Sequence, residues 1–128
     1  MPTKITIELP QTLTKKEAIE ILKREALKKK FKKTEIFEKY AKNKDIAYKI
    51  ADYVDRYLKR YYKDLKFDIL LDYDLDEDIN IIRVLVTNKI STDKKMEIED
   101  KLEDITDLKF GDVSFNNIII LERRNYEF

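Results

Sequence analysis

The stretch KFDILLDYDLDEDINIIRVLVT, residues 66–87, decides the fold class of this chain. From residue 67 to 73 apolar side chains alternate with mostly acidic ones, which is the two-residue period of a strand with one dry and one largely wet face. Residues 79–87 are apolar on both faces apart from Asn80 and Arg83, so this second strand should lie inside a sheet. Two neighbouring strands with a short polar link predict an antiparallel hairpin.

The link itself, DYDLDEDIN at residues 72–80, is acidic enough to raise the question of a metal site. An EF-hand calcium loop beginning at Asp72 needs glycine at its sixth position and glutamate at its twelfth. Those positions hold Glu77 and Arg83, which argues against a loop of that type. The pattern favours the solvated tip of a hairpin, because Asp is common in turns and acidic tips discourage pairing between sheet edges.

A magnesium site is the alternative interpretation of the same residues. Asp72, Asp74 and Asp76 could hold Mg²⁺ at a strand end, as in a metal-dependent nuclease or phosphotransferase. Such enzymes usually add glycine-rich or basic elements for the substrate phosphates, and Arg83 is the clear basic residue on the flanking strands. The sequence therefore favours a protein without catalytic residues and without a metal or other cofactor.

The residues that follow the hairpin predict a helix and a last strand. Residues 91–93 offer N-cap candidates for the helix, which should end before Gly111, whose missing Cβ suits a turn with positive φ. Residues 113–122 form the last predicted strand, in which residues 118–121 are apolar enough to predict burial on both sides. The result is a ββαβ unit that reaches the C-terminal end of the chain.

The N-terminal half predicts one strand followed by helices. Residues 4–9 alternate and are closed by Pro10, as in a half-buried strand. Thr14 and Glu17 have the spacing of a capping box, so a helix should begin there. The apolar residues of this helix lie on two sides, which indicates either a break near residues 28–30 or contacts on both sides.

Two further helices are expected before the hairpin. Thr34 can cap a short helix, and residues 43–45 restart a longer one. In the longer helix, apolar and tyrosine side chains recur at three- and four-residue spacing from Ile46 to Tyr61, which predicts a stripe that faces the core.

These elements together predict an α+β fold with a mostly antiparallel sheet. The order of strands and helices admits a ferredoxin-like arrangement. The pairing of the N-terminal strand stays open, and an unassigned strand can pair with another chain. We expect one compact globular unit, made of a basic strand-plus-helices region at residues 1–65 and an acidic ββαβ region at residues 66–128.

Composition removes several classes of function. Cysteine, histidine and tryptophan are absent, which excludes disulfides, zinc sites built from Cys or His, and acid–base catalysis by histidine. With Gly111 as the only glycine, phosphate-binding loops rich in glycine are excluded as well. The longest wholly apolar run is residues 118–121, against the roughly 20 residues of a membrane span, so we expect a cytoplasmic protein. Charged residues make up 41% of the chain and glutamine appears once, which predicts a thermophile protein, although an AT-rich genome would also raise Lys, Ile, Asn and Tyr.

Charge is divided unevenly along the chain. Residues 1–66 carry 19 Lys and Arg against 10 Asp and Glu, and residues 67–128 carry 8 against 16. Either the basic half binds a partner, or the two halves neutralise one another within one fold or one dimer.

One basic stretch suggests nucleic-acid binding, through Arg56, Lys59, Arg60 and Tyr62. Basic residues that alternate with aromatics can bind phosphates and stack on unpaired bases, which predicts a small RNA- or DNA-binding domain. The structural alternative is that the helix dipole stabilises cations in the last turns of a helix and that the neighbouring tyrosines belong to the core stripe.

Residues 4–30, KITIELPQTLTKKEAIEILKREALKKK, resemble the opening of small prokaryotic antitoxins of the ribbon-helix-helix or VapB-like kind. Such antitoxins open with an alternating strand that ends in Leu-Pro and is followed by a helix. Residues 45–62 are similar to the charged helix with which they often continue. The resemblance implies an archaeal or bacterial protein that binds and inhibits a toxin, with DNA binding through a ribbon of two N-terminal strands.

The leading hypothesis is therefore a non-enzymatic protein-binding module, antitoxin-like, that contacts a partner protein or a second copy of itself in a homodimer. The residues assigned to that contact are Ile5, Ile7, Leu27 and Phe31. A nucleic-acid-binding domain and a metal-dependent enzyme are the alternatives.

Overall fold

The computed structural model describes residues 14–124, and the chain divides into two compact units, Met1–Lys30 and Phe31–Phe128. The boundary falls inside the basic region that the sequence assigns to residues 1–65. The described part of the first unit contains helix α1 (Lys15–Lys30). The second unit contains, in chain order, β1 (Lys32–Lys33), α2 (Glu35–Tyr40), α3 (Lys44–Tyr61), β2 (Phe67–Asp74), β3 (Ile79–Val86), α4 (Thr92–Phe110), the 3-10 helix η1 (Gly111–Asn116) and β4 (Asn117–Arg123).

Helix α1 begins where the sequence predicts. The amide of Thr14 donates to the Glu17 carboxylate at 2.8 Å and the amide of Glu17 donates to the Thr14 hydroxyl at 3.0 Å, so the capping box is formed. The helix ends at Lys30, in agreement with the predicted break. It has no buried residue, and both Ile19 and Leu22 are exposed. Among the described helices, none combines the length and the hydropathy that a membrane crossing requires.

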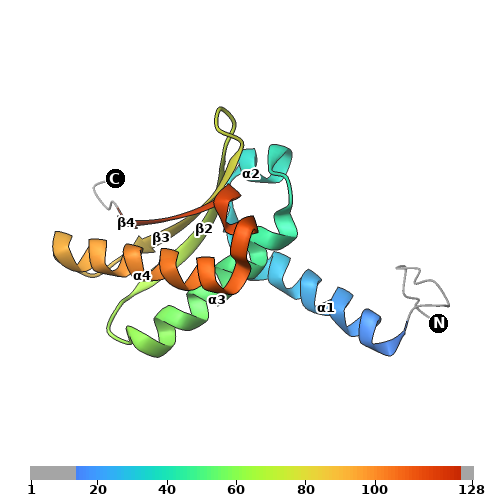
Figure 1. Cartoon of the computed structure of the whole chain (residues 1–128), viewed down its shortest axis with the longest axis horizontal. Helices are drawn as coiled ribbons and strands as arrows, with labels where there is room; N and C mark the ends of the chain where they lie inside the picture. Colours follow the sequence, from blue (N-terminus) through green and yellow to red (C-terminus); the bar gives the residue numbers. More distant parts are fainter. Residues whose placement is uncertain (1–13, 125–128) are drawn as a thin grey trace. The chain divides into compact units, whose positions relative to one another are not determined.

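Four strands form one sheet in the order β1-β2-β3-β4 (Figure 1). Strands β2 and β3 are antiparallel, whereas β1 with β2 and β3 with β4 are parallel. The α+β class and the ββαβ order are confirmed, but the prediction of a mostly antiparallel sheet is wrong, because the sheet is mixed. Helix α4 makes the long crossover that a parallel pair such as β3 and β4 needs.

The ferredoxin-like arrangement is not confirmed. In that fold the first and third strands lie side by side at the centre of the sheet, whereas here β3 lies between β2 and β4. The position of β3 inside the sheet agrees with its apolar sequence. The strand predicted at residues 4–9 lies outside the described residues.

The acidic link between β2 and β3 is a hairpin turn. Asp74 pairs with Ile79 across the hairpin, so residues 75–78 make the connection. The Asp74 carboxylate accepts hydrogen bonds from the amides of Asp76 at 2.9 Å and Glu77 at 3.2 Å. Such bonds from an Asp side chain to the following amides stabilise a turn, which confirms the hairpin interpretation.

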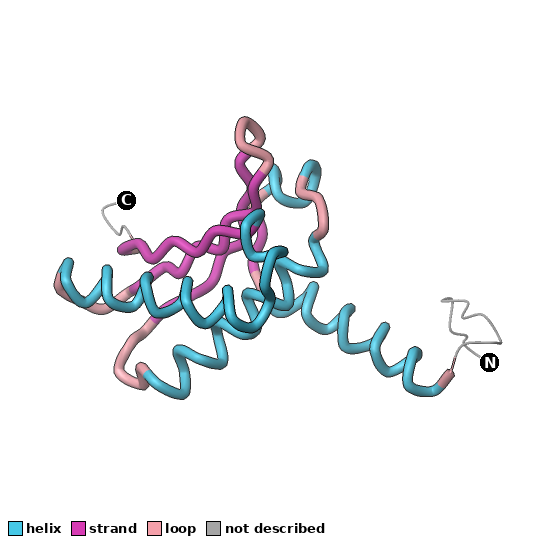
Figure 2. The backbone as a smooth tube through the Cα atoms, viewed as in Figure 1, coloured by secondary structure: helices cyan, strands magenta, loops and turns pink. Residues whose placement is uncertain are grey.

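One face of the sheet is covered by α3 and α4, which lie on the same side of it (Figures 1 and 2), and we call it the covered face. Alternate strand residues that point to this face are almost completely buried, among them Ile69, Leu71, Ile82, Val84 and Leu121. Helix α3 contributes a stripe of side chains that are fully buried: Ala47, Ile50, Ala51, Val54 and Leu58. Tyr61, which the sequence assigns to this stripe, is exposed instead.

The helix caps follow the sequence closely. The Thr34 hydroxyl accepts from the amide of Phe37 at 3.1 Å and so caps α2, and the Ser91 hydroxyl accepts from the amide of Lys94 at 3.0 Å and so caps α4. Gly111 ends α4 with a φ of 65°, a conformation that glycine adopts at little cost.

The last strand is shorter than predicted and lies at the edge of the sheet. Residues 113–116, assigned to the strand from the sequence, belong to η1, and β4 begins at Asn117. Within the described part of the chain, β4 pairs with β3 alone. The prediction that residues 118–121 are buried on both sides is wrong. Ile118 is 42% exposed, because it points away from the face that α3 and α4 cover.

Candidate functional site

The face of the sheet opposite α3 and α4 is the candidate site, and we call it the open face. Alternate residues of β2, β3 and β4 point to it, and none of them is buried. Its aliphatic members are Leu70, Ile79, Ile81, Leu85, Ile118 and Ile120. Its charged members are Asp68, Asp72, Asp74, Arg83 and Glu122, together with Arg124, the residue that follows β4. Contiguous aliphatic side chains that stay partly exposed are a common mark of an interaction surface.

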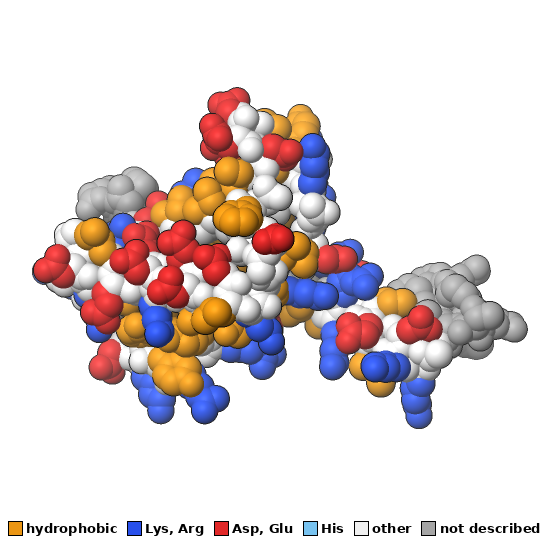
Figure 3. Space-filling model, in the orientation of Figure 1, with side chains coloured by type: hydrophobic (Ala, Val, Ile, Leu, Met, Phe, Trp, Pro, Cys, Tyr) orange, Lys and Arg blue, Asp and Glu red, His pale blue; other side chains and the backbone are white. Residues whose placement is uncertain are grey.

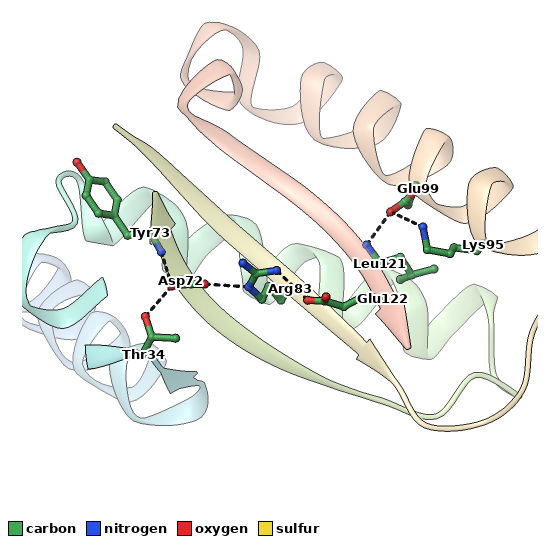
Figure 4. Close-up of polar contacts among 8 residues, drawn as sticks. All are labelled: Thr34, Asp72, Tyr73, Arg83, Lys95, Glu99, Leu121 and Glu122. Atoms are coloured by element: carbon green, nitrogen blue, oxygen red, sulfur yellow. Dashed lines mark hydrogen bonds and ion pairs between the residues drawn. The ribbon is translucent and has the colours of Figure 1, made fainter. Parts of the chain in front are cut away.

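Arg83 occupies the centre of the open face and binds two carboxylates (Figure 4). Its Nε donates to Asp72 Oδ2 and its Nη1 to Glu122 Oε2, each at 2.9 Å. Arg83 is paired with Leu70 on β2 and with Ile120 on β4, so both ion pairs run diagonally between aliphatic side chains. Partial burial by itself would lower the pKa of Arg83, but the bonds to Asp72 and Glu122 raise the pKa above its usual value.

Asp72 connects this network to the start of α2. Its Oδ1 accepts from the Thr34 hydroxyl and from the Tyr73 amide, each at 2.8 Å. Burial by itself would raise the pKa of Asp72, but the hydrogen bonds from Tyr73, Thr34 and Arg83 outweigh it and hold the pKa below its usual value. Since Thr34 also caps α2, the helix start and the open face share one side chain.

A second ion pair completes the open face, between Arg124 Nη1 and Asp68 Oδ2 at 2.8 Å. With both arginines paired, their charges are compensated within the protein itself. No family model, curated protein or solved structure matches this chain.

The open face is the site that sequence reasoning missed. The sequence reveals two parts of it. The alternation of residues 67–73 distinguishes the polar side of β2 from its apolar side, and Arg83 is recognisable as a cation among aliphatic neighbours. The contact between Arg83 and Glu122, however, joins residues 39 positions apart through the parallel pairing of β3 with β4. No local pattern in the sequence encodes that pairing.

The three carboxylates predicted as a metal site have separate roles. Asp72 binds Arg83, Asp74 accepts hydrogen bonds from the turn amides, and Asp76 is exposed in the turn. Within residues 14–124, no three His, Cys, Asp or Glu side chains are grouped so that they could hold a metal ion.

The residues predicted to bind nucleic acid lie together at the end of α3: Arg56, Lys59, Arg60 and Tyr62. Two of the cations are neutralised within the helix, since Arg56 pairs with Asp52 at 2.8 Å and Lys59 pairs with Asp55 at 3.2 Å. The other two residues make cation–π contacts with neighbouring side chains. Carboxylates beside these cations oppose the approach of a phosphate, so the geometry favours the structural interpretation of this stretch.

The residues predicted to contact a protein partner fall in different places. Ile5 and Ile7 lie outside the described residues, and Leu27 is half-buried in α1. Phe31 is 7% exposed and therefore contributes to the core of the second unit. The substitution Phe31→Asp would place a carboxylate in that core and would therefore lower the stability of the fold. The role of Leu27 in partner binding stays a prediction.

Proposed function

We propose that this chain is a non-enzymatic protein-binding module that acts in the cytoplasm and that the open face of its sheet contacts the partner. The observation that carries the proposal is the composition of that face. Six aliphatic side chains remain partly exposed around an arginine whose charge is already compensated by two carboxylates. Such a surface offers apolar area to a partner without leaving the charge of Arg83 unpaired in the contact.

The charge of the open face argues for a protein rather than a nucleic acid as the partner. Four carboxylates and two arginines point to it, so its net charge is negative. Nucleic-acid binding depends on cations that neutralise phosphates. A face with a net negative charge would repel those phosphates. A partner surface with aliphatic side chains and a few basic residues would match it best.

The antitoxin-like opening of the chain gives the proposal its most specific form, which is the inhibition of a toxin by stoichiometric binding. Helix α1 supports this form, because it leaves Ile19 and Leu22 exposed and has no buried residue. A helix of 16 residues is only marginally stable in water without packing. We propose that α1, including Leu27, adds a second contact with a partner.

Affinity capture tests the proposal. The tagged protein is incubated with extract of its native host, with and without nuclease, and compared with the variants Ile81→Lys and Leu85→Lys. Ile81 pairs with Asp72, and Leu85 pairs with Asp68 and Glu122, so each new lysine would have a carboxylate close by and the fold should be kept. Met96→Lys on α4, where Met96 is 54% exposed, is the matched control.

The expected result is a stoichiometric protein that survives nuclease and is captured by the wild type and by Met96→Lys, but not by either variant of the open face. Equal capture by all four proteins would remove the open face from the proposal. Capture of nucleic acid without any protein would overturn the proposed function. Thermal unfolding of each variant shows whether a lost partner reflects the surface or the fold.

A further inference from the structure

Strand β4 has an edge that points away from the sheet. The Arg124 amide donates to the Val86 carbonyl at 2.8 Å, so at this position the backbone turns toward β3. Because backbone groups alternate along a strand, the amides of Ile119, Leu121 and Arg123 point the other way. In the part of the chain that the structure describes, no strand pairs with β4 on that side. An exposed strand edge is a template for pairing with another chain.

The Leu121 amide, which lies on this edge, already makes a hydrogen bond to a side chain. It donates to Glu99 Oε2 at 2.8 Å, and Glu99 in turn lies 3.4 Å from Lys95 (Figure 4). The carboxylate takes the place that the carbonyl of a neighbouring strand would occupy. Glu99 therefore blocks strand addition at the centre of the edge, and a strand that pairs there must displace it.

A groove with acidic and apolar walls runs beside the same edge, between α4 and β4, with a volume of about 300 Å³. Asp100 and Glu103 line it, and both side chains are exposed. Phe115 and Ile118 also line it and are 76% and 42% exposed. Figure 3 shows the acidic side chains as a row along α4.

We propose that the edge of β4 binds an extended peptide segment of a partner, in which aliphatic and basic residues alternate. Paired with β4, the segment would point every second side chain toward α4, where Asp100 and Glu103 attract a cation. The other side chains would extend the aliphatic row of the open face beside Ile118 and Ile120. This inference rests on the proposed function, since it names the chemistry of the partner and the manner in which the sheet binds it.

Substitutions of Glu99 can distinguish strand pairing from simple attraction between the basic peptide and the acidic groove. Replacing Glu99 by Ala or by Gln removes the same negative charge. Gln keeps an oxygen that can accept from the Leu121 amide, whereas Ala leaves the amide open for a strand. Strand addition therefore predicts that the Glu99→Ala protein binds the segment more tightly than the Glu99→Gln protein, by about three- to tenfold, the worth of one hydrogen bond.

The probe is a synthetic seven-residue peptide that alternates lysine and isoleucine, with blocked ends and a fluorescent label, and its binding is measured by anisotropy. A peptide that alternates glutamate and isoleucine is the charge control. Glu103→Ala should weaken binding of the lysine peptide by about two- to fivefold, as expected for one exposed charge pair. Glu97→Ala is the matched control on α4, because Glu97 pairs with Lys94 and does not line the groove, and it should leave affinity unchanged.

Hydrogen exchange on the wild type gives the second readout. Bound lysine peptide should slow exchange of the Ile119 and Arg123 amides. Four results would overturn the proposal: no binding of the lysine peptide, equal binding of the glutamate peptide, equal affinity of the Ala and Gln variants, or binding without amide protection. Loss of this inference would leave the capture experiment with Ile81→Lys unaffected, so the two failures can be told apart.

Discussion

The two faces of the sheet are built from neighbouring residues of the same strands but have opposite surroundings. On β3, Ile82 is fully buried on the covered face, whereas Ile81 stays partly exposed on the open face. The residue type is the same, so the difference comes from α3 and α4, which pack on one side only. We infer that the covered face supplies the stability of the fold and that the open face is available for binding.

The largest effect should come from removing apolar volume on the covered face. Ile82→Ala is expected to lower the free energy of unfolding by about 2–5 kcal/mol, because it loses buried methyl groups and leaves a cavity. Urea denaturation followed by circular dichroism measures the change. Ile82→Val, which removes one methyl group, is the graded control at about 0.5–1.5 kcal/mol. A loss below about 1 kcal/mol for Ile82→Ala would mean that this face is not the core.

The next effect concerns a polar side chain on the covered face. Asn80 is 4% exposed, and its Nδ2 donates to the Lys42 carbonyl at 3.2 Å and to Asn117 Oδ1 at 3.0 Å. Asn80→Ala leaves both acceptors without their donor, so we expect a loss of about 1–3 kcal/mol in the free energy of unfolding. Asn116→Ala, at an exposed position, should change that free energy little. Equal effects of the two variants would contradict the role given to Asn80.

A smaller and pH-dependent effect is expected on the open face. Asp72→Asn should cost about 1 kcal/mol at neutral pH, because it weakens the charge-assisted bonds from Arg83 and Thr34. The folded pKa of Asp72 lies below its usual value of about 3.9, so the ionised carboxylate stabilises the fold above that pH. This advantage of the wild type should disappear as the pH falls through the folded pKa.

Urea denaturation of both proteins at pH 7 and at pH 3 measures that dependence. We expect the difference in the free energy of unfolding between the wild type and Asp72→Asn to be smaller at pH 3 than at pH 7. A difference that widens on acidification would mean that burial dominates over the hydrogen bonds and that the pKa of Asp72 is raised in the folded protein.

The smallest effect should come from Ile81→Ala, the neighbour of Ile82 on the open face. Because Ile81 is partly exposed, it loses less contact, and we expect a decrease of less than about 1 kcal/mol in the free energy of unfolding. The ratio of the Ile82 and Ile81 effects expresses the difference between the two faces. Similar losses at both positions would show that the open face is also packed against something in the free protein.

Local signals in the sequence account for most of the elements. The Thr14–Glu17 capping box, the Thr34 cap and the acidic hairpin turn each depend on residues within a few positions of one another, and all three form as predicted. Strand β1 has two residues, too few for any periodicity to reveal it. The edge position of β4 was also missed, because its apolar run has the composition of a central strand.

The candidate site was harder to predict than the fold because it depends on pairings between distant strands. Alternation identifies which residues of one strand share a face, but not which face the helices cover. Arg83 forms its two ion pairs because β2 and β4 lie on either side of β3, and this arrangement is not encoded near Arg83 in the sequence. For Phe31 the sequence suggested a contact residue, whereas packing buries it.

The measurement that tests the central claim most directly is footprinting of the open face in the free and partner-bound protein. Hydroxyl radicals label exposed aliphatic side chains, and mass spectrometry locates the label. With the captured partner bound, labelling should fall at Ile81, Leu85, Ile118 and Ile120 and stay unchanged at Met96 on α4. Unchanged labelling of the open face, with protection confined to Ile19 and Leu22 of α1, would contradict the claim that the sheet binds the partner.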